Sequence, residues 1–313
     1  MSRKKFKSSV MLLLTALIWG LSFVVQSVGT GYLGAFTFNG VRFLLGAAAL
    51  VPCMLLLLFV HKNRQYPAER AAGAFYRIFH NNRSQVREGI KGGICCGIAL
   101  CTASAIQQTG LAYTSVGKAG FITALYIVIV PLCRLCTGKK TPGKIWFSVA
   151  AAVFGLYLLC IKENFSAGFG DCLIFLCSIA FAAHILAIDH FSPKADGIFL
   201  SFIQFLTAGV ISWGFAFLLE TPRLEDIFAA RFLVLYAGVM SCGVAFTLQV
   251  IAQKNTDPAS ASLLLSLESV FSAIFGWLIL HEILAPKELL GCALVFCGVI
   301  LAQLPDRPKP VRN

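Results

Sequence analysis

The sequence predicts an all-α integral membrane protein in which ten transmembrane helices form two inverted five-helix repeats. Three observations predict this fold: the composition, ten long apolar runs and a sparse internal repeat. Of the 313 residues, 58% are apolar and only 13% are charged, and the mean hydropathy is +0.80. Soluble domains carry about 25% charged residues, so most of this surface must face lipid.

Ten mostly apolar runs follow one another along the chain, each near the length of about 20 residues that crosses a bilayer. Their predicted bounds are 10–29, 35–60, 90–111, 117–137, 143–161, 170–189, 197–219, 231–253, 258–280 and 286–304. The basic N-terminus and the first run could form a signal peptide, but no clear cleavage site of small residues follows them. We therefore interpret the first run as a retained helix.

Lysine and arginine are distributed unequally between the two sides of this arrangement. With the N-terminus inside, the inner side carries 20 of them and the outer side five, while Arg42 lies within a span. Because cytoplasmic loops are enriched in these residues, the sequence predicts a multi-pass protein of the cell (inner) membrane with both termini cytoplasmic. The net charge of +12 is then a topology signal, and no nucleic-acid partner is expected.

Five spans per half is an odd number, so the second of two repeated halves must be inverted. When Gln107 is aligned with Gln249, each copy shows a span with a polar end, a tight polar turn and a span that opens with small residues. The halves are predicted at 1–161, with a cytoplasmic loop at about 61–89, and at 162–313. Such repeats build a site near the bilayer midplane, although chance similarity between two apolar hairpins is the alternative.

Four segments carry a resemblance to a known family. They are Leu17 to Phe23 in the first span, Arg42-Phe43 in the second, Gln107 to Pro131 across the third and fourth, and Ser266 to Ala273 with His281-Glu282 at the ninth span and its exit. Together they resemble EamA-type members of the drug/metabolite transporter superfamily, over nearly the whole chain. The resemblance implies two five-span repeats and secondary transport of small metabolites or amino acids, often export, through a cavity that opens alternately to each side. The family usually has proline where this chain has Ser269, so a different local helix geometry is expected there.

Polar side chains in the middle of a span are costly in hydrocarbon, so they are candidates for the site. Glu268, midway along the ninth span, could bind a proton or a cationic substrate group, or form a structural hydrogen bond. The alignment of Gln107 with Gln249 also pairs Glu268 with Tyr126, at the equivalent point of the fourth span. The phenol of Tyr126 could donate a hydrogen bond to a ligand, or its ring could simply pack.

Further candidates lie in three other spans. His184, midway along the sixth span, could titrate near neutral pH or be hydrogen-bonded within the bundle. Trp19 lies away from the interface where tryptophan collects, and it could line a cavity or pack. Arg42 could hold an anionic group such as a carboxylate or snorkel outward, and a structural pair is favoured. Gate or helix-end groups are predicted at Gln107, Gln249 and Lys118, which flank the two equivalent turns.

The third span carries a small residue at every fourth position. The positions are Gly89, Gly93, Gly97, Cys101 and Ala105. Small residues at this spacing let a neighbouring helix approach closely. The stripe therefore predicts helix packing, with sliding during a conformational cycle as a secondary hypothesis.

Motifs of other function classes are missing. Gly110 to Lys118 departs from a P-loop in spacing and is followed by Ala119 instead of serine or threonine, and the one CxxC, Cys133 to Cys136, has no second ligand pair. No cofactor, metal or catalytic residue is therefore expected, and the chain is predicted not to be an enzyme. The expected partners are the lipid bilayer, a small-molecule substrate and, if transport is coupled, protons. An intramembrane enzyme and a non-transporting receptor or scaffold are the alternatives, and a homodimer is left open.

Overall fold

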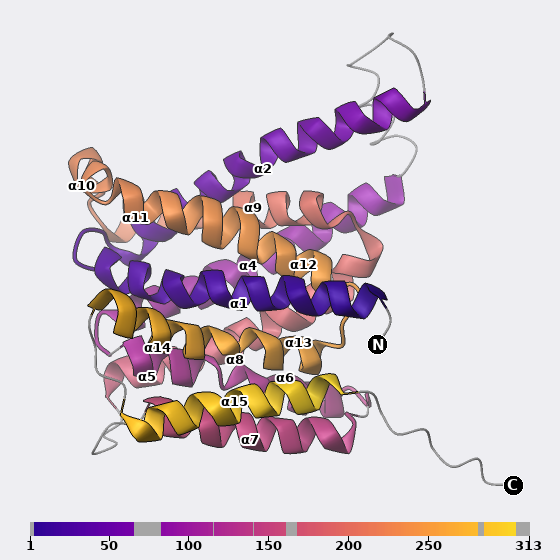
Figure 1. The fold of residues 1–313 in the computed structure, drawn as a ribbon. Coiled ribbons are helices and arrows are strands. Elements are labelled where there is room, and N and C mark those ends of the chain that lie inside the picture. The colour runs from indigo at the N-terminus through magenta and orange to yellow at the C-terminus, as the bar shows by residue number, and fades with distance from the viewer. Residues whose placement is uncertain are drawn as a thin grey trace, which may run out of the picture.

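The computed structural model describes residues 3–65, 83–114, 116–139, 141–160, 168–280 and 285–304, and all regular structure in these ranges is helical (Figure 1). Residues 66–82 of the predicted cytoplasmic loop lie outside the described residues. The predicted boundary between the halves at 161/162 and the His281-Glu282 pair also lie outside them.

The first half contains five helical units, each of which coincides with one predicted span. They are α1 (Arg3–Gly29), α2 (Ala35–Gln65), α4 (Arg83–Leu111), the interrupted helix made of α5 (Val116–Thr123) and α6 (Tyr126–Cys136), and α7 (Gly143–Cys160). α1, α2 and α4 extend past the predicted apolar runs into basic segments, because a helix does not have to end where the hydrocarbon ends.

The second half repeats this order. It contains α8 (Phe169–Phe191) with the short η1 (Ser192–Lys194), α9 (Gly197–Leu219), the short α10 (Leu224–Ala229), one helix made of α11 (Arg231–Leu235), η2 (Tyr236–Phe246) and α12 (Thr247–Gln253), the interrupted helix made of α13 (Pro258–Leu265) and α14 (Leu267–Leu280), and α15 (Pro286–Gln303). The η2 segment is π-helical, a form that is often found at functional sites.

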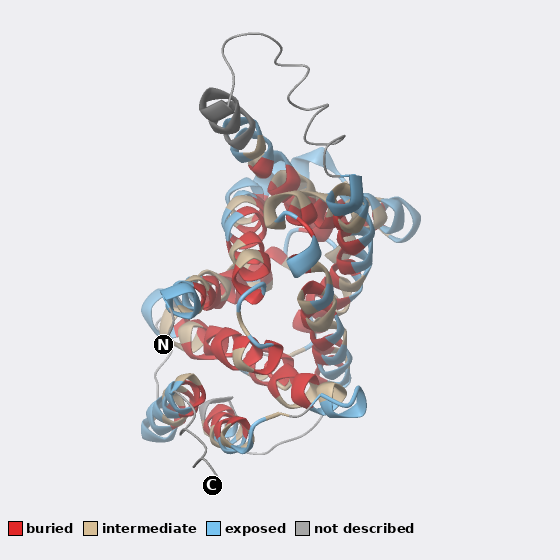
Figure 2. Ribbon diagram, turned by 90° about the vertical axis from the view of Figure 1, so that its right-hand side faces the viewer, coloured by how far each residue is buried: buried red, intermediate tan, exposed pale blue. Residues whose placement is uncertain are grey.

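The helical units have the length and the surface of membrane spans. Nine helical segments of the described chain are long and apolar enough to cross a bilayer, and α7 adds a shorter apolar helix over Gly143–Leu158. Buried residues face the interior, whereas exposed ones form the rim (Figure 2). Large apolar side chains on that rim, such as Phe147 and Phe217, are 74% and 71% exposed, which is expected where the neighbour is lipid. The predicted all-α membrane fold is confirmed.

Two registers relate the halves along the chain. The first, which we call the glutamine register, aligns Gln107 with Gln249 and also the ends of α4 and α12. The second, which we call the α2/α9 register, aligns the starts of α2 and α9, Ala35 with Gly197. The two registers differ by 20 residues. α2 and α4 together are 14 residues longer than α9 and the helix from α11 to α12, and the connection between α2 and α4 is six residues longer than the connection between α9 and α11. Most of the extra length therefore lies at the end of α2 and the start of α4.

Corresponding helices run in opposite directions. The hydroxyl of Ser9, near the start of α1, donates to Oε1 of Gln303 at the end of α15 over 3.1 Å, so both ends lie on one side of the bundle. The chain then crosses the bundle three times, in α1, α2 and α4, so α5 begins on the opposite side, where Lys118 contacts Asp171 in the first turn of α8. α1 and α8 thus start on opposite sides, as an inverted repeat requires.

The stripe of small residues on α4 packs against α9. A Cβ atom added to Gly93 would lie 2.5 Å from the side chain of Ile203, and one added to Gly97 would lie 2.7 Å from the carbonyl oxygen of Gln204. No larger residue fits at either position without moving the helices apart. The packing role predicted for the stripe is therefore confirmed.

Two helices at equivalent places are interrupted at equivalent residues. α5 and α6 meet at Ala124 and Leu125, and α13 and α14 meet at Ser266, which the glutamine register aligns with Ala124. Near each interruption the backbone N–H bonds three residues back, with N···O distances of 3.0 Å from Ile127 to Ala124 and 3.2 Å from Ser269 to Ser266. Such tightening within a helix often marks a hinge. Pro131 lies inside α6 and not at the interruption.

Candidate functional site

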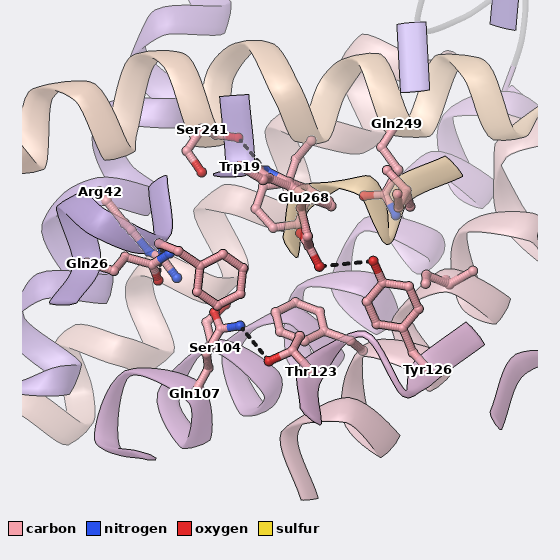
Figure 3. A pocket seen from close by; sticks show the side chains of 15 residues that line it. Trp19, Gln26, Arg42, Ser104, Gln107, Thr123, Tyr126, Ser241, Gln249 and Glu268 are labelled. Carbon is pink, nitrogen blue, oxygen red and sulfur yellow. Dashed lines mark hydrogen bonds between the residues drawn. The ribbon is translucent and has the colours of Figure 1, made fainter. Parts of the chain in front are cut away.

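A pocket lies between the two halves, and its wall consists of side chains from α1, α2, α4, α5 and α6 of the first half and α8, η2, α12, α13 and α14 of the second (Figure 3). The lining residues are Trp19, Phe23, Gln26, Arg42, Ser104, Gln107, Thr123, Tyr126, Phe181, Ile185, Ser241, Phe246, Gln249, Leu265 and Glu268.

Most of this lining follows the two registers between the halves. In the glutamine register the lining pairs are Ser104 with Phe246, Gln107 with Gln249, Thr123 with Leu265, and Tyr126 with Glu268; in the α2/α9 register they are Trp19 with Phe181 and Phe23 with Ile185. The pocket is therefore built twice on the same backbone plan, and apart from the glutamine pair each half supplies different side chains.

Tyr126 and Glu268 contact each other across the pocket. The hydroxyl of Tyr126 donates to Oε1 of Glu268 over 2.9 Å, and the two residues are only 3% and 4% exposed (Figure 3). Each residue follows its helix interruption closely, which brings the two side chains together. The next residue, Ser269, donates from Oγ to the carbonyl oxygen of Gly120 over 2.8 Å. A proline at this position could not make that bond, which ties α14 to α5.

Arg42 lies in another part of the pocket wall, on α2. Its Nη1 donates to Oε1 of Gln26 over 2.8 Å, and its guanidinium carbon lies 4.9 Å and 5.7 Å from the ring centres of Phe43 and Phe38. Nε has no hydrogen-bond partner among the described residues. Within the described ranges no carboxylate lies at ion-pair distance from Arg42. The structural ion pair that the sequence favours is not found there, because a neutral amide occupies that place and Glu268 bonds to Tyr126.

Aromatic rings form a further part of the wall. The ring centres of Trp19 and Phe246 lie 4.5 Å apart, and Nε1 of Trp19 donates to the carbonyl oxygen of Ser241 over 3.4 Å. Ser22 donates to the hydroxyl of Ser241 over 3.1 Å, or accepts from it. These contacts hold α1 against the π-helical η2 and place Trp19 at the pocket.

Gln107 and Gln249 lie one turn before the ends of α4 and α12 and face the pocket. Nε2 of Gln107 donates to the hydroxyl of Thr123 over 3.4 Å, whereas Oε1 of Gln249 has no hydrogen-bond partner among the described residues. Lys118 is not part of the lining: it lies in the first turn of α5, with Nζ 3.3 Å from a carboxylate oxygen of Asp171. Whether these three residues act as gates stays a prediction.

His184 is fully buried outside the pocket lining. Its Nε2 lies 3.2 Å from Oε1 of Gln204 on α9, and its ring packs edge-on against Phe246 with 5.9 Å between the ring centres. Phe246 itself lines the pocket, so this ring lies next to both. The geometry favours the hydrogen-bonded interpretation of His184.

The free space in the pocket is small in this conformation. Its volume, counted as the space open to the centre of a water molecule, is about 30 Å³. About 10 to 15 Å³ measured in this way holds one water, so only a few waters fit. Binding of a metabolite therefore requires the surrounding helices or side chains to move.

Comparison with known proteins decides the family. A model of the EamA-like transporter family matches the chain twice, over residues 6–161 and 168–304. The chain belongs to this family. The EamA protein is therefore a multi-pass membrane transporter and not an enzyme, and its partners include the lipid bilayer and a small-molecule substrate.

Individual proteins and one solved structure are similar to this EamA transporter over nearly their whole lengths. An uncharacterized transporter of Archaeoglobus fulgidus is 30% identical over 96% of this chain and 87% of its own. The uncharacterized transporter YoaV of Bacillus subtilis is 22% identical over 91% and 92% of the two chains. A crystal structure with 16% identity covers 95% of this chain and 96% of its own, with a TM-score of 0.69. It shows the shared fold alone.

Several lining residues are missed by sequence reasoning. One signal was available: Gln26 lies seven residues after Trp19, so the two share a face of α1, and this polar stripe within an apolar span indicates an inward face. Ser104 and Thr123 give no comparable signal, because small hydroxyl residues also occur at ordinary helix contacts in membranes.

Proposed function

We propose that this EamA transporter is a secondary exporter of small metabolites or amino acids that works by alternating access and exchanges its substrate for protons at Glu268. The observation that carries the proposal is the hydrogen bond between Tyr126 and Glu268. It joins the two repeats at residues that closely follow their helix interruptions, so a change at either hinge changes the surroundings of the carboxyl group.

Alternating access is supported by three features of the fold. The pocket lies between inverted repeats, an arrangement that lets one half rock against the other. The interruptions at Ala124 and Ser266 give both halves a hinge beside the pocket. The free space of about 30 Å³ is too small for a metabolite, so the transporter must open to load one.

Proton exchange follows from the chemistry of a single buried carboxyl group. Glu268 is 4% exposed, and Tyr126 is its hydrogen-bond partner. A carboxylate can bind a proton or a cationic substrate group but not both, because protonation removes the charge that attracts the cation. The proton and the substrate therefore compete for Glu268. Because the pocket opens to only one side at a time, this competition exchanges one for the other across the membrane.

The direction of transport depends on orientation. Twenty lysine and arginine residues on one side against five on the other support cytoplasmic termini. Where the outer solution is more acidic, protons load Glu268 from outside and substrate loads it from inside, so the substrate leaves the cell. A facilitator that works without protons is the alternative, and its flux would not respond to a pH gradient.

Flux into liposomes that contain the purified protein tests the proposal. Amino acids, sugars and amphipathic cations are supplied with and without a pH gradient, and we expect one class to move faster when protons flow the opposite way. Glu268→Gln keeps the size of the side chain but removes the titrating group, so gradient-driven flux should fall by at least about 30-fold, the loss typical of removing a buried charged group.

Tyr126→Phe is the matched control, because it removes one hydrogen bond and leaves the carboxyl group in place. This variant should transport more slowly but still respond to the gradient. Size-exclusion chromatography checks that both variants are folded. Wild-type flux with unchanged pH dependence in Glu268→Gln would contradict the role of Glu268.

A further inference from the structure

Arg42 is a buried charge that its protein neighbours leave uncompensated. It is 2% exposed, and its guanidinium group stays protonated in proteins. Its surroundings are the amide of Gln26 and the faces of Phe38 and Phe43, which attract a cation but carry no net negative charge. Nε has no hydrogen-bond partner in the described part of the chain. A buried cation in such a place is expected to meet an anionic group, and a ligand that enters when the pocket opens can supply one.

Other unpaired polar groups lie in or beside the same part of the pocket. Ser104 is fully buried, lines the pocket and has no partner for Oγ among the described residues. Asn39 is also fully buried, and within the same ranges neither atom of its amide group is bonded. It lies three residues before Arg42, hence on the same face of α2. Buried polar groups of this kind normally have hydrogen-bond partners in a folded protein, so this region is suited to a polar ligand.

The two charged residues of the lining carry opposite charges and come from different repeats. In Figure 3 Arg42 and Gln26 lie at the left, whereas Glu268 lies near the middle of the view with Tyr126 to its right. Each charged side chain is bonded to a neutral one rather than to the other. With Glu268 ionised, the lining has no net charge but carries a positive and a negative group at separate places.

We propose that the pocket binds small zwitterions, with Arg42 and its neighbours receiving the anionic group and Glu268 the cationic group. This inference rests on the proposed function, because it assigns the ligand of the same pocket. A substrate that is only a cation would leave the charge of Arg42 without a partner. A substrate that is only an anion would leave the carboxylate of Glu268 without one. A substrate with one charge of each sign satisfies both, and a planar carboxylate matches the N–H donors of a guanidinium group.

Equilibrium binding to the detergent-purified transporter tests the inference. The twenty standard amino acids are compared first by thermal stabilisation. The amino acid that binds best is then compared with its primary amide, which lacks the carboxylate, and with its N-acetyl derivative, which lacks the ammonium group. We expect each derivative to bind at least about 10-fold more weakly, since each loses a charge-assisted contact.

Variants assign each charge of the ligand to one residue. In Arg42→Gln the amino acid should bind only as tightly as its amide, while discrimination against the N-acetyl derivative remains. In Glu268→Gln the pattern should be reversed. Arg42→Lys keeps the charge but loses the planar donor fork, so its discrimination should be intermediate. A purely structural Arg42 would weaken the binding of all three ligands equally, and that outcome would overturn the proposal.

Wild-type comparisons decide the matter even where Arg42→Gln does not fold. Equal binding of the amino acid and its amide by the wild-type protein overturns the inference. So does transport of sugars or of simple cations together with no binding of any amino acid, although the proposed exporter function then stands. Flux of no solute class under any gradient overturns the proposed function itself, and with it this inference.

Discussion

At the pocket, the first repeat presents mainly hydroxyl and amide groups and the one arginine, whereas the second presents mainly apolar side chains, together with Ser241, Gln249 and the one acid. The equivalent pairs are Ser104 and Phe246, Gln107 and Gln249, Thr123 and Leu265, and Tyr126 and Glu268. Only the glutamine pair has kept its residue type. The backbone plan is therefore repeated while the chemistry has diverged.

The second-helix position shows the same divergence. The α2/α9 register aligns Arg42 with Gln204, which lies outside the lining and bonds to His184. One repeat thus turns a cation toward the pocket, and the other uses a neutral amide to hold two helices together. The two inverted repeats thus share a backbone plan, while their side chains give the pocket two different ends.

The largest expected effect comes from exchanging the two residues that meet at the centre. Tyr126→Glu alone places a second carboxyl group next to Glu268, and like charges so close destabilise each other. Glu268→Tyr alone removes the titrating group. Each single variant should lose at least about 30-fold of gradient-driven liposome flux. The double variant restores one phenol and one carboxyl group and should recover at least about 10-fold over either single variant, within the range of coupling measured for contacting residues.

Failure of that recovery would mean that the two positions are not interchangeable. A double variant that folds, as judged by size-exclusion chromatography, and transports no better than the worse single variant contradicts the symmetry of the central pair.

A smaller effect is expected from making the first repeat resemble the second. Ser104→Phe places a ring at the position equivalent to Phe246, in a pocket with free space of only about 30 Å³. Overfilling of this kind costs about 1 to 3 kcal/mol, so substrate affinity measured by equilibrium binding should fall by about 10-fold.

Ser104→Ala is the matched control for that variant. The hydroxyl of Ser104 has no hydrogen-bond partner among the described residues and can bond to the substrate. Its removal should therefore lower affinity by about 3-fold, toward the low end of the value of one neutral hydrogen bond and less than the added ring does. Equal affinity in Ser104→Phe and Ser104→Ala would show that the substrate does not occupy this part of the pocket.

The smallest effect is expected at His184, which lies behind the pocket wall. His184→Phe keeps a ring against Phe246 but removes the hydrogen bond to Gln204, so it should lower the free energy of unfolding by about 1 kcal/mol, the value of one hydrogen bond. Thermal unfolding in detergent measures this loss, and liposome flux should stay within about 2-fold of wild type. Loss of gradient-driven flux without loss of stability would instead assign His184 to proton coupling.

Much of the fold can be predicted from the sequence because the bilayer fixes the length of each apolar run. The helices observed begin or end close to the predicted spans, and the glutamine register also pairs Tyr126 with Glu268. The α2/α9 register is hidden, because Trp19 and Phe181 share no motif and because the extra length at the end of α2, at the start of α4 and in their connection shifts the alignment.

The site is harder to predict than the fold, for physical reasons. The interruptions at Ala124 and Ser266 carry neither proline nor glycine. The hydroxyl of Ser266 donates to the carbonyl oxygen of Leu263 over 2.8 Å, a local bond that often bends helices, but a serine within an apolar span does not by itself reveal this bond. The sequence cannot show that Arg42 bonds to Gln26 rather than to an acid, since that depends on which faces of α1 and α2 meet. That Tyr126 and Glu268 touch each other likewise follows only from the three-dimensional arrangement.

Competition between protons and substrate for Glu268 is tested most directly by the protons released when substrate binds. A saturating amount of the transported solute is added to the purified transporter in weak buffer at a series of pH values, and the pH change is recorded. Linkage predicts a release that rises to about one proton per bound substrate in wild type and falls to none in Glu268→Gln. Substrate binding with no proton release at any pH in the wild-type protein, or with the same release in both proteins, would contradict exchange at this carboxyl group.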